Sequence, residues 1–202
     1  MPTDPASERT GASPSRRRPL LVAAAVVVVL LIAAFGVRSF VVAPFRVPSS
    51  SMAPTLRTGD VVLADRSTRG TAERGEIVVF DGSGYFPKQG AISSYWVKRV
   101  VAVGGDHISC CSKGRLILNG KPLEEPYLPR GTDTSTVRFD LEVPEGRMFV
   151  LGDSRTDSTD SRFLLGQPGG GMIPVDRVVG EASRIVWPRD RAGTPGQLGS
   201  AR

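Results

Sequence analysis

The sequence contains one histidine, His107, and two cysteines, Cys110 and Cys111, which are adjacent. A serine hydrolase usually takes its base from a histidine held by a carboxylate. His107 follows Asp106 in a turn, where a lone histidine is more often solvated or structural than catalytic. The cysteines lack the C-x-x-C spacing and the histidine partner of a metal site, so we expect neither a metal nor another cofactor. They either form a vicinal disulfide or remain thiols.

Beyond residues 1–18, the sequence also lacks any block of lysine or arginine that resembles a nucleic-acid-binding arm. The net charge is nevertheless +6, and residues 1–18 supply +2 of it through four arginines against two acidic residues. This balance fits proximity to anionic lipid better than binding to nucleic acid. Long amphipathic periods are scarce, whereas 23 Gly and 16 Pro favour turns and strands over helices.

The N-terminal part divides into a polar tail and an apolar run. Residues 1–18 are too poor in apolar side chains to fold and predict a disordered tail. Leu20–Val37 is almost long enough to span a bilayer, which predicts a transmembrane helix at residues 19–38. A cleaved signal peptide is the alternative, but Phe35–Phe40 lacks a clean small-x-small cleavage site. Because Arg16–Arg18 precede the run, we expect a cytoplasmic N-terminus and an extracytoplasmic domain on the cell membrane.

The remaining residues form about one domain, and they read as short strands separated by turns. Apolar runs and turn signals predict strands at 61–64, 77–80, 95–103, 147–151 and 177–187. Asn119-Gly120 is a strong signal for a tight hairpin turn and predicts a β-ribbon insertion within about 107–147. We therefore expect a mainly β domain at 39–188, followed by a disordered tail at 189–202.

A serine-rich turn lies just after the apolar run, in the sequence FRVPSSSMAPTLRTGD. Its three consecutive serines, Ser49–Ser51, stand between Pro48 and Pro54. The prolines fix φ and remove backbone donors, so they bracket a non-helical turn that can present a hydroxyl outward. A serine run also occurs in ordinary linkers, and this segment alone does not separate a nucleophile from a linker.

Lys98 interrupts Tyr95–Val103, the most apolar strand that we predict. Burial disfavours an ammonium and lowers its pKa, so a buried lysine can act as a base. An ordinary lysine is neutral in only a few parts per ten thousand at pH 7, and a useful base needs a pKa about three units lower, worth roughly 4 kcal/mol. The alternative places Lys98 on the solvent face of an edge strand, and periodicity does not separate the two.

Four motifs occur together: PSSSMAPTL at Pro48–Leu56, RGEIVVF at Arg74–Phe80, KRVVAVGGD at Lys98–Asp106 and GDSRTDSTDSR at Gly152–Arg162. In this order they resemble the bacterial type I signal peptidases, membrane-bound Ser/Lys proteases that remove signal peptides from exported proteins. The resemblance spans the anchor and nearly the whole exported domain. It implies an antiparallel, barrel-like β-sheet with a small β-ribbon subdomain. It also implies cleavage of preproteins after Ala-x-Ala by a monomer in the lipid bilayer.

The resemblance assigns roles by position. Ser51 aligns with the nucleophile, Lys98 with the general base, and Ser49 with the hydroxyl that joins the Ser51 backbone N–H in the oxyanion hole. Ser158 aligns with the hydroxyl that orients the lysine. The residues expected to brace the site are Asp153, Asp160 and Arg162. The positions that match the substrate pocket are Phe45, Val47, Pro48, Met52, Leu56, Tyr95 and Val97.

The chain departs from the family pattern in two places. Thr156-Asp157 stands where the family usually has Asp-Asn, and Trp96 replaces a residue that is often aliphatic, which predicts a narrower substrate pocket.

Two other functions stay open. A self-cleaving repressor shares the Ser/Lys pair, but the apolar run argues against it. A non-enzymatic, membrane-anchored binding module is the other alternative, and the intact Ser/Lys pair argues against that.

Overall fold

The structure is a computed structural model that describes residues 17–87 and 94–196. The chain divides into two compact units, Met1–Ser39 and Phe40–Arg202. Helix α1 (Arg17–Val41) is 25 residues long and is built mostly from Val, Ala and Leu. Its apolar side chains between Leu21 and Ile32 are exposed. Among the described residues, no helix meets the combined requirement of length and hydropathy for crossing a membrane.

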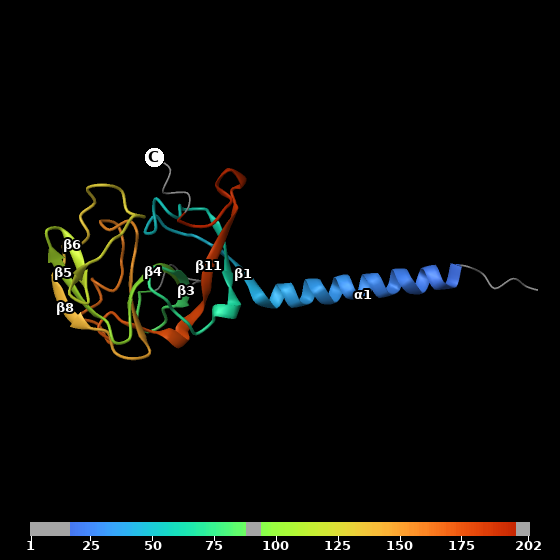
Figure 1. Cartoon of the computed structure of the whole chain (residues 1–202), viewed down its shortest axis with the longest axis horizontal. Coiled ribbons are helices and arrows are strands. Elements are labelled where there is room, and N and C mark those ends of the chain that lie inside the picture. Colours follow the sequence, from blue (N-terminus) through green and yellow to red (C-terminus); the bar gives the residue numbers. More distant parts are fainter. Residues whose placement is uncertain (1–16, 88–93, 197–202) are drawn as a thin grey trace, which may run out of the picture. The chain divides into compact units, whose positions relative to one another are not determined.

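The second unit is built on an antiparallel sheet of seven strands, which confirms the prediction of a mainly β fold (Figure 1). Its strands, in spatial order, are β1 (Val42–Arg46), β2 (Val61–Asp65), β11 (Val178–Trp187), β3 (Ile77–Asp81), β4 (Tyr95–Val103), β9 (Arg147–Leu151) and β10 (Ile173–Pro174). Strands β3, β4 and β9 are buried along most of their length. Their near-continuous apolar runs are the reason that they form the centre of the sheet.

This sheet curls strongly. Three strands separate β1 from β4 in the spatial order, yet the Phe45 ring meets the Tyr95 ring edge-on with their centroids 5.5 Å apart. Val97 of β4 also packs against the same apolar cluster as Val47, which follows β1. The pairing register shifts along β11 and in β4, and such bulges increase the local twist. The curl brings the residues after β1 next to the middle of β4.

A second sheet has four strands, in the spatial order β7 (Lys121–Pro122), β6 (Arg115–Leu118), β5 (His107–Ser112) and β8 (Phe139–Glu142) (Figure 1). Asn119 and Gly120 both have positive φ, 51° and 78°. That combination is the one that a two-residue hairpin turn requires. His107 belongs to this sheet, and its half-exposed side chain pairs with Asp140 at 2.6 Å.

The predicted disordered tail at 189–202 is wrong for its first residues. A short 3-10 helix covers Arg189–Arg191, and Gly193 forms a β-bridge with Ile185. The Arg191 guanidinium lies 2.9 Å from the carboxylate of Asp60, which is almost fully buried. A buried carboxylate needs a counter-charge, so this segment folds back onto the domain. Residues 1–16 and 197–202, where we also expect disordered tails, lie outside the described residues.

Candidate active site

Ser51 and Lys98 meet in the interior of the domain. The Lys98 Nζ donates a hydrogen bond to the Ser51 Oγ at 2.6 Å across 47 residues of sequence. The Lys98 side chain lies in the middle of β4 and is 0% exposed, while Ser51 is 9% exposed. The Ser49 Oγ lies 3.2 Å from the Ser51 Oγ. The structure therefore brings the predicted nucleophile, base and oxyanion-hole hydroxyl together.

The turn that carries Ser51 is fixed at both ends. Backbone hydrogen bonds join Ala53 N to Ser50 O at 2.8 Å and Leu56 N to Met52 O at 2.9 Å. Met52 and Leu56 are almost completely buried in the apolar cluster beneath the turn. Because the core holds the side chains that follow Ser51, the Ser51 hydroxyl lies within hydrogen-bond distance of Lys98 in β4.

The surroundings of Lys98 lower the pKa of its amine. Burial is the main cause, and it lowers the pKa of Lys98 from 10.5 to about 8. The carboxylates of Asp160 and Asp153 oppose this shift, and the Arg162 guanidinium reinforces it. The Lys98 Nζ also lies 5.3 Å from the centre of the Trp96 ring. A lysine in this position can accept a proton from Ser51 at a pH close to neutral.

Asp160 and Arg162 form a buried ion pair close to Lys98. The Arg162 Nη2 lies 2.8 Å from the Asp160 Oδ2, and both side chains are essentially inaccessible to solvent. The same Asp160 oxygen accepts a hydrogen bond from the Gly152 N–H at 3.0 Å. The Arg162 Nη2 also donates to the Arg155 carbonyl at 2.9 Å. The pair therefore fixes the backbone of the loop between β9 and Arg162.

Ser158 lies in this loop and is buried. A Cβ added to Gly152 would clash with the Ser158 Oγ, so the two residues are in close contact. Within the described residues, the Ser158 Oγ has no hydrogen-bond partner, and the one side-chain hydrogen bond that Lys98 donates there goes to Ser51. The structure places Ser158 beside the site, and its role in orienting Lys98 stays a prediction.

Asp153 pairs with a residue that the sequence analysis did not select. Arg99 donates to the two Asp153 oxygens at 2.9 and 2.6 Å, and Thr55 donates to the same carboxylate at 2.5 Å. Thr55 belongs to the serine turn and Arg99 to β4, so Asp153 ties three segments of the site together. The strand pattern could not identify Arg99, because its partner Asp153 lies 54 residues further along the chain.

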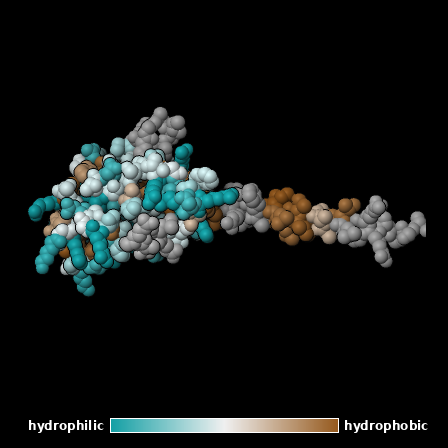
Figure 2. Space-filling view, turned by 90° about the horizontal axis from the view of Figure 1, so that it is seen from above, coloured by the Kyte–Doolittle hydropathy of each residue, from teal (hydrophilic) through white to brown (hydrophobic). Residues whose placement is uncertain are grey.

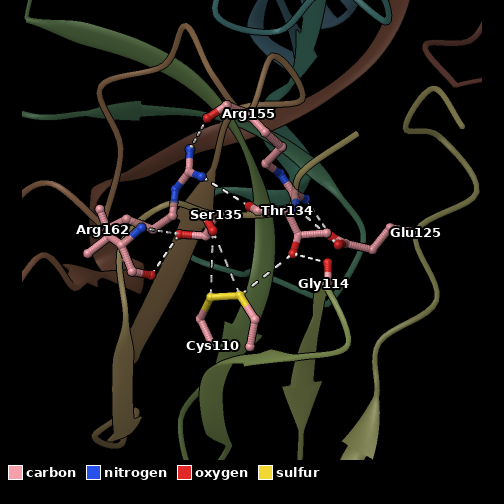
Figure 3. Close-up of a disulfide and its surroundings, with 9 residues drawn as sticks. Cys110, Gly114, Glu125, Thr134, Ser135, Arg155 and Arg162 are labelled. Atoms are coloured by element: carbon pink, nitrogen blue, oxygen red, sulfur yellow. Dashed lines mark hydrogen bonds and ion pairs between the residues drawn. A yellow bond between two sulfur atoms is a disulfide. The ribbon is translucent and has the colours of Figure 1, made fainter. Parts of the chain in front are cut away.

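A second buried pair lies further from the serine. The Arg155 Nη1 donates to the Glu125 carboxylate at 2.9 Å, and both side chains are buried. The Thr134 carbonyl accepts from Arg162 at 3.1 Å and from Arg155 at 3.5 Å. Figure 3 shows both guanidinium groups directed toward this backbone segment. The segment at Thr134 thus supports the loop that carries the last sequence motif.

The two cysteines form a disulfide, which decides between the alternatives left open by the sequence. Their sulfur atoms lie 4.0 and 3.9 Å from the Ser135 carbonyl, and Cys111 also contacts the Thr134 hydroxyl at 3.8 Å. The disulfide is therefore next to the segment that receives the Arg155 and Arg162 hydrogen bonds (Figure 3). Within the described residues, no group of three or more His, Cys, Asp or Glu side chains is arranged to hold a metal ion.

A cleft of about 390 Å³ opens beside Ser51. One part of its lining comes from the serine turn and another from the loop of the last motif. The lining residues are Ser49, Ser50, Ser51, Trp96, Thr156, Asp157, Ser158, Thr159 and Phe163. The two positions that depart from the family pattern in this loop, Thr156 and Asp157, are thus part of the cleft wall.

The residues that match the substrate pocket do not line this cleft. Val47, Met52 and Leu56 are buried in one apolar cluster, and Phe45 and Val97 pack against it half-buried. Pro48 and Tyr95 are exposed. These residues occupy the curled region between β1 and the start of β4.

Comparison with known proteins gives consistent results. The family described as "Signal peptidase, peptidase S26" matches residues 20–187. A probable signal peptidase I of Mycobacterium leprae is 33% identical over 80% of this chain and 74% of its own length. Signal peptidase I U of Bacillus subtilis is 34% identical over 76% of this chain and 80% of its own length. A crystal structure of a signal peptidase I from Enterococcus faecalis is similar with a TM-score of 0.42 and 25% identity, over 55% of this chain and 96% of that chain.

Proposed function

The chain belongs to the signal peptidase family S26, and we propose that it is a type I signal peptidase, a serine endopeptidase that removes signal peptides from exported preproteins. One observation carries the mechanism. A fully buried lysine amine lies at hydrogen-bond distance, 2.6 Å, from a serine hydroxyl. A serine is a weak nucleophile until a nearby base accepts its proton, and burial prepares Lys98 for that task.

The proposed reaction is acyl transfer. Neutral Lys98 accepts the Ser51 proton as the Ser51 Oγ attacks the substrate carbonyl. The Ser49 hydroxyl and the Ser51 N–H donate to the oxygen that becomes negative, which stabilises the transition state more than the ground state. Lys98 then gives its proton to the leaving amine. It afterwards removes a proton from the water that attacks the ester and returns that proton to the Ser51 Oγ as the ester bond breaks. The 3.2 Å separation of the Ser49 and Ser51 hydroxyls supports this assignment.

We assign the bracing of Lys98 to the loop of the last motif. The ion pair between Asp160 and Arg162 fixes the backbone at Gly152, and Ser158 lies against that glycine. A rotation of the Ser158 side chain toward Lys98 would let its hydroxyl accept a hydrogen bond from one of the lysine N–H groups. Asp153 holds β4 and the serine turn together through Arg99 and Thr55.

The substrate would lie extended beside β1 and the start of β4, where the main chain provides affinity and shallow pockets provide selectivity. Val47 and Met52 belong to the apolar cluster next to Ser51, and the Phe45 ring contacts the Tyr95 ring. We expect these apolar residues to form a shallow pocket for small side chains, which agrees with cleavage after Ala-x-Ala. Trp96 adds a large ring to the cleft wall.

We also propose that α1 anchors the enzyme in the lipid bilayer. Its side chains from Leu21 to Ile32 are apolar and exposed, and Figure 2 shows them as a hydrophobic surface. Such a surface is favourable in lipid and unfavourable in water. The arginines of residues 16–18 argue for a cytoplasmic N-terminus and an extracytoplasmic catalytic unit. Anchoring would raise the local concentration of membrane-held preproteins, and the enzyme would act as a monomer.

Cleavage of a preprotein by the purified full chain tests this function. Ser51→Ala and Lys98→Ala should each abolish cleavage while circular dichroism shows an unchanged β-sheet spectrum. A variant that still processes the preprotein at the wild-type rate would remove the Ser/Lys mechanism. If the wild-type chain binds the preprotein without cleaving it, the binding-module alternative is favoured. Cleavage of its own chain alone would indicate the repressor type.

A further inference from the structure

The cleft beside Ser51 contains a charge that the catalytic mechanism does not use. Among the described residues that line it, Asp157 is the one with an ionisable side chain, and the others are hydroxyl or aromatic residues. The Ser50 Oγ donates to the Asp157 Oδ2 at 2.6 Å, joining two segments that are 107 residues apart. Because Ser50 directly precedes Ser51 in the sequence, this hydrogen bond holds the Asp157 carboxylate next to the residue before the nucleophile.

In the binding mode proposed above, this cleft would receive the part of the substrate that follows the cut. The residues that match the signal-peptide pocket, including Phe45, Val47 and Tyr95, contribute nothing to its lining. An extended peptide that approaches Ser51 past those residues must leave on the other side of the serine. Extended chain advances about 3.3 Å per residue, so the first two residues of the mature protein would lie within about 7 Å of Ser51. The wall there consists of Ser50 and Thr156–Thr159.

We propose that Asp157 selects substrates by the charge of the first two residues of the mature protein, favouring a basic side chain there and disfavouring an acidic one. This inference rests on the proposed function, because it assigns the cleft to the leaving part of the cleaved chain. It follows from Coulomb attraction between the carboxylate and a cationic side chain in the same cleft. The position is a departure of this chain from the Asp-Asn pattern of its family, so the charge is a property of this sequence.

The field of Asp157 extends to the reacting groups. Burial is the main cause of the lowered pKa of Lys98, and Asp157 is one of the carboxylates that oppose that shift. A charge that acts on the Lys98 amine also acts on a substrate side chain bound in the cleft that Asp157 lines. Asp157 is itself exposed, so salt screens its interaction with a substrate and the preference must weaken at high ionic strength.

A purely structural role for Asp157 makes a different prediction. If the carboxylate served only to receive the Ser50 hydrogen bond and hold the two loops together, its loss would slow the cleavage of every substrate by the same factor. Asp157→Asn removes the charge and keeps the shape and an acceptor oxygen. Ser50→Ala removes the hydrogen bond and keeps the charge. The two variants therefore separate charge from loop bonding.

The test uses three peptides that are identical except for Lys, Gln or Glu at the first position after the cut. For the wild type at about 50 mM salt we expect kcat/KM to be roughly two- to fivefold higher for the Lys peptide than for the Glu peptide, a ratio typical of one exposed charge pair. Asp157→Asn should bring the ratio close to one, whereas Ser50→Ala should keep it. At about 500 mM salt the wild-type ratio should also approach one.

Equal kcat/KM values for the Lys and Glu peptides with the wild type would overturn the proposal, and so would a Lys/Glu ratio that Asp157→Asn leaves unchanged. Loss of the preference in Ser50→Ala as complete as in Asp157→Asn would show that loop bonding, not charge, is responsible. Fluorescence anisotropy of the same peptides with Ser51→Ala, with and without Asp157→Asn, measures the preference without cleavage. If the wild type cleaved none of the peptides, the proposed function would fail, while the order of these affinities would still decide the role of Asp157.

Discussion

The pH dependence of cleavage tests whether Lys98 is the base. With its pKa lowered to about 8 by burial, Lys98 is neutral in roughly one molecule in ten at pH 7. An ordinary lysine with a pKa of 10.5 would be neutral in roughly three molecules in ten thousand. Burial therefore increases the active fraction about three-hundredfold, which corresponds to about 3 kcal/mol. The rate should rise with pH along an acid limb with its midpoint near 8.

The assay is kcat/KM for a signal-peptide substrate between about pH 5 and 10, because this parameter reports the ionisation of the free enzyme. Below about pH 7 the rate should fall tenfold per pH unit. His107→Gln is the matched control, because His107 lies half-exposed beside Asp140 in the second sheet. A midpoint near 6.5 that disappears in His107→Gln would refute a lysine base. A midpoint near 10 would refute the burial argument.

The same protonation also affects stability. The pKa of Lys98 is lower in the folded state than in the unfolded state, so the charged form opposes folding. This cost is complete below about pH 8 and disappears as the pH rises toward 10.5. Lys98→Met should therefore abolish cleavage and yet increase the free energy of unfolding by about 2 to 3 kcal/mol at pH 6, with little gain at pH 10. Urea unfolding of the two proteins at both pH values measures this difference, and equal gains at the two would contradict it.

Three further substitutions test separate parts of the site. Ser49→Ala should lower kcat about 10²- to 10³-fold with little change in KM, because it removes an oxyanion donor, and a wild-type kcat would exclude that role. Gly152→Ala should abolish activity, because the added Cβ would collide with the Ser51 carbonyl, and steady-state kinetics on the folded variant would show it. Asp153→Asn should lower the unfolding free energy by about 3 kcal/mol, since Arg99 would stay buried without a counter-charge. Denaturant unfolding measures this loss, and an unchanged midpoint would contradict it.

Much of the fold could be predicted from local pattern. The apolar runs at 77–80, 95–103 and 147–151 are central strands because they are buried on both faces, and Asn119-Gly120 forms the turn that its residues require. The spatial order of the strands has no such local signal. β11 (Val178–Trp187) is distant in sequence from β2 and β3 and yet inserts between them, and this pairing depends on the packed sheet as a whole.

The site could be predicted less completely. Nothing local distinguishes Ser51 from the two serines before it, and the resemblance to a family supplied the choice. The geometry agrees with it, because among these serines Ser51 receives the Lys98 hydrogen bond. Periodicity could not establish that Lys98 is buried, since β4 is buried along both faces and alternation gives no signal there. Arg99 and Glu125 were missed because their partners are distant in sequence.

Lys98 and Arg99 show how one strand produces two different kinds of buried cation. They are consecutive in β4 and point to opposite faces. Arg99 meets the Asp153 carboxylate at 2.6 Å, which supplies the counter-charge for a guanidinium group that keeps its proton in proteins. Lys98 meets a hydroxyl at the same distance, 2.6 Å, and burial lowers its pKa to about 8. Burial is therefore common to both, but the lysine amine can lose its proton near neutral pH and the guanidinium cannot. A carboxylate at position 51 would hold Lys98 as an ammonium, and the strand would then contain two ion pairs and no base.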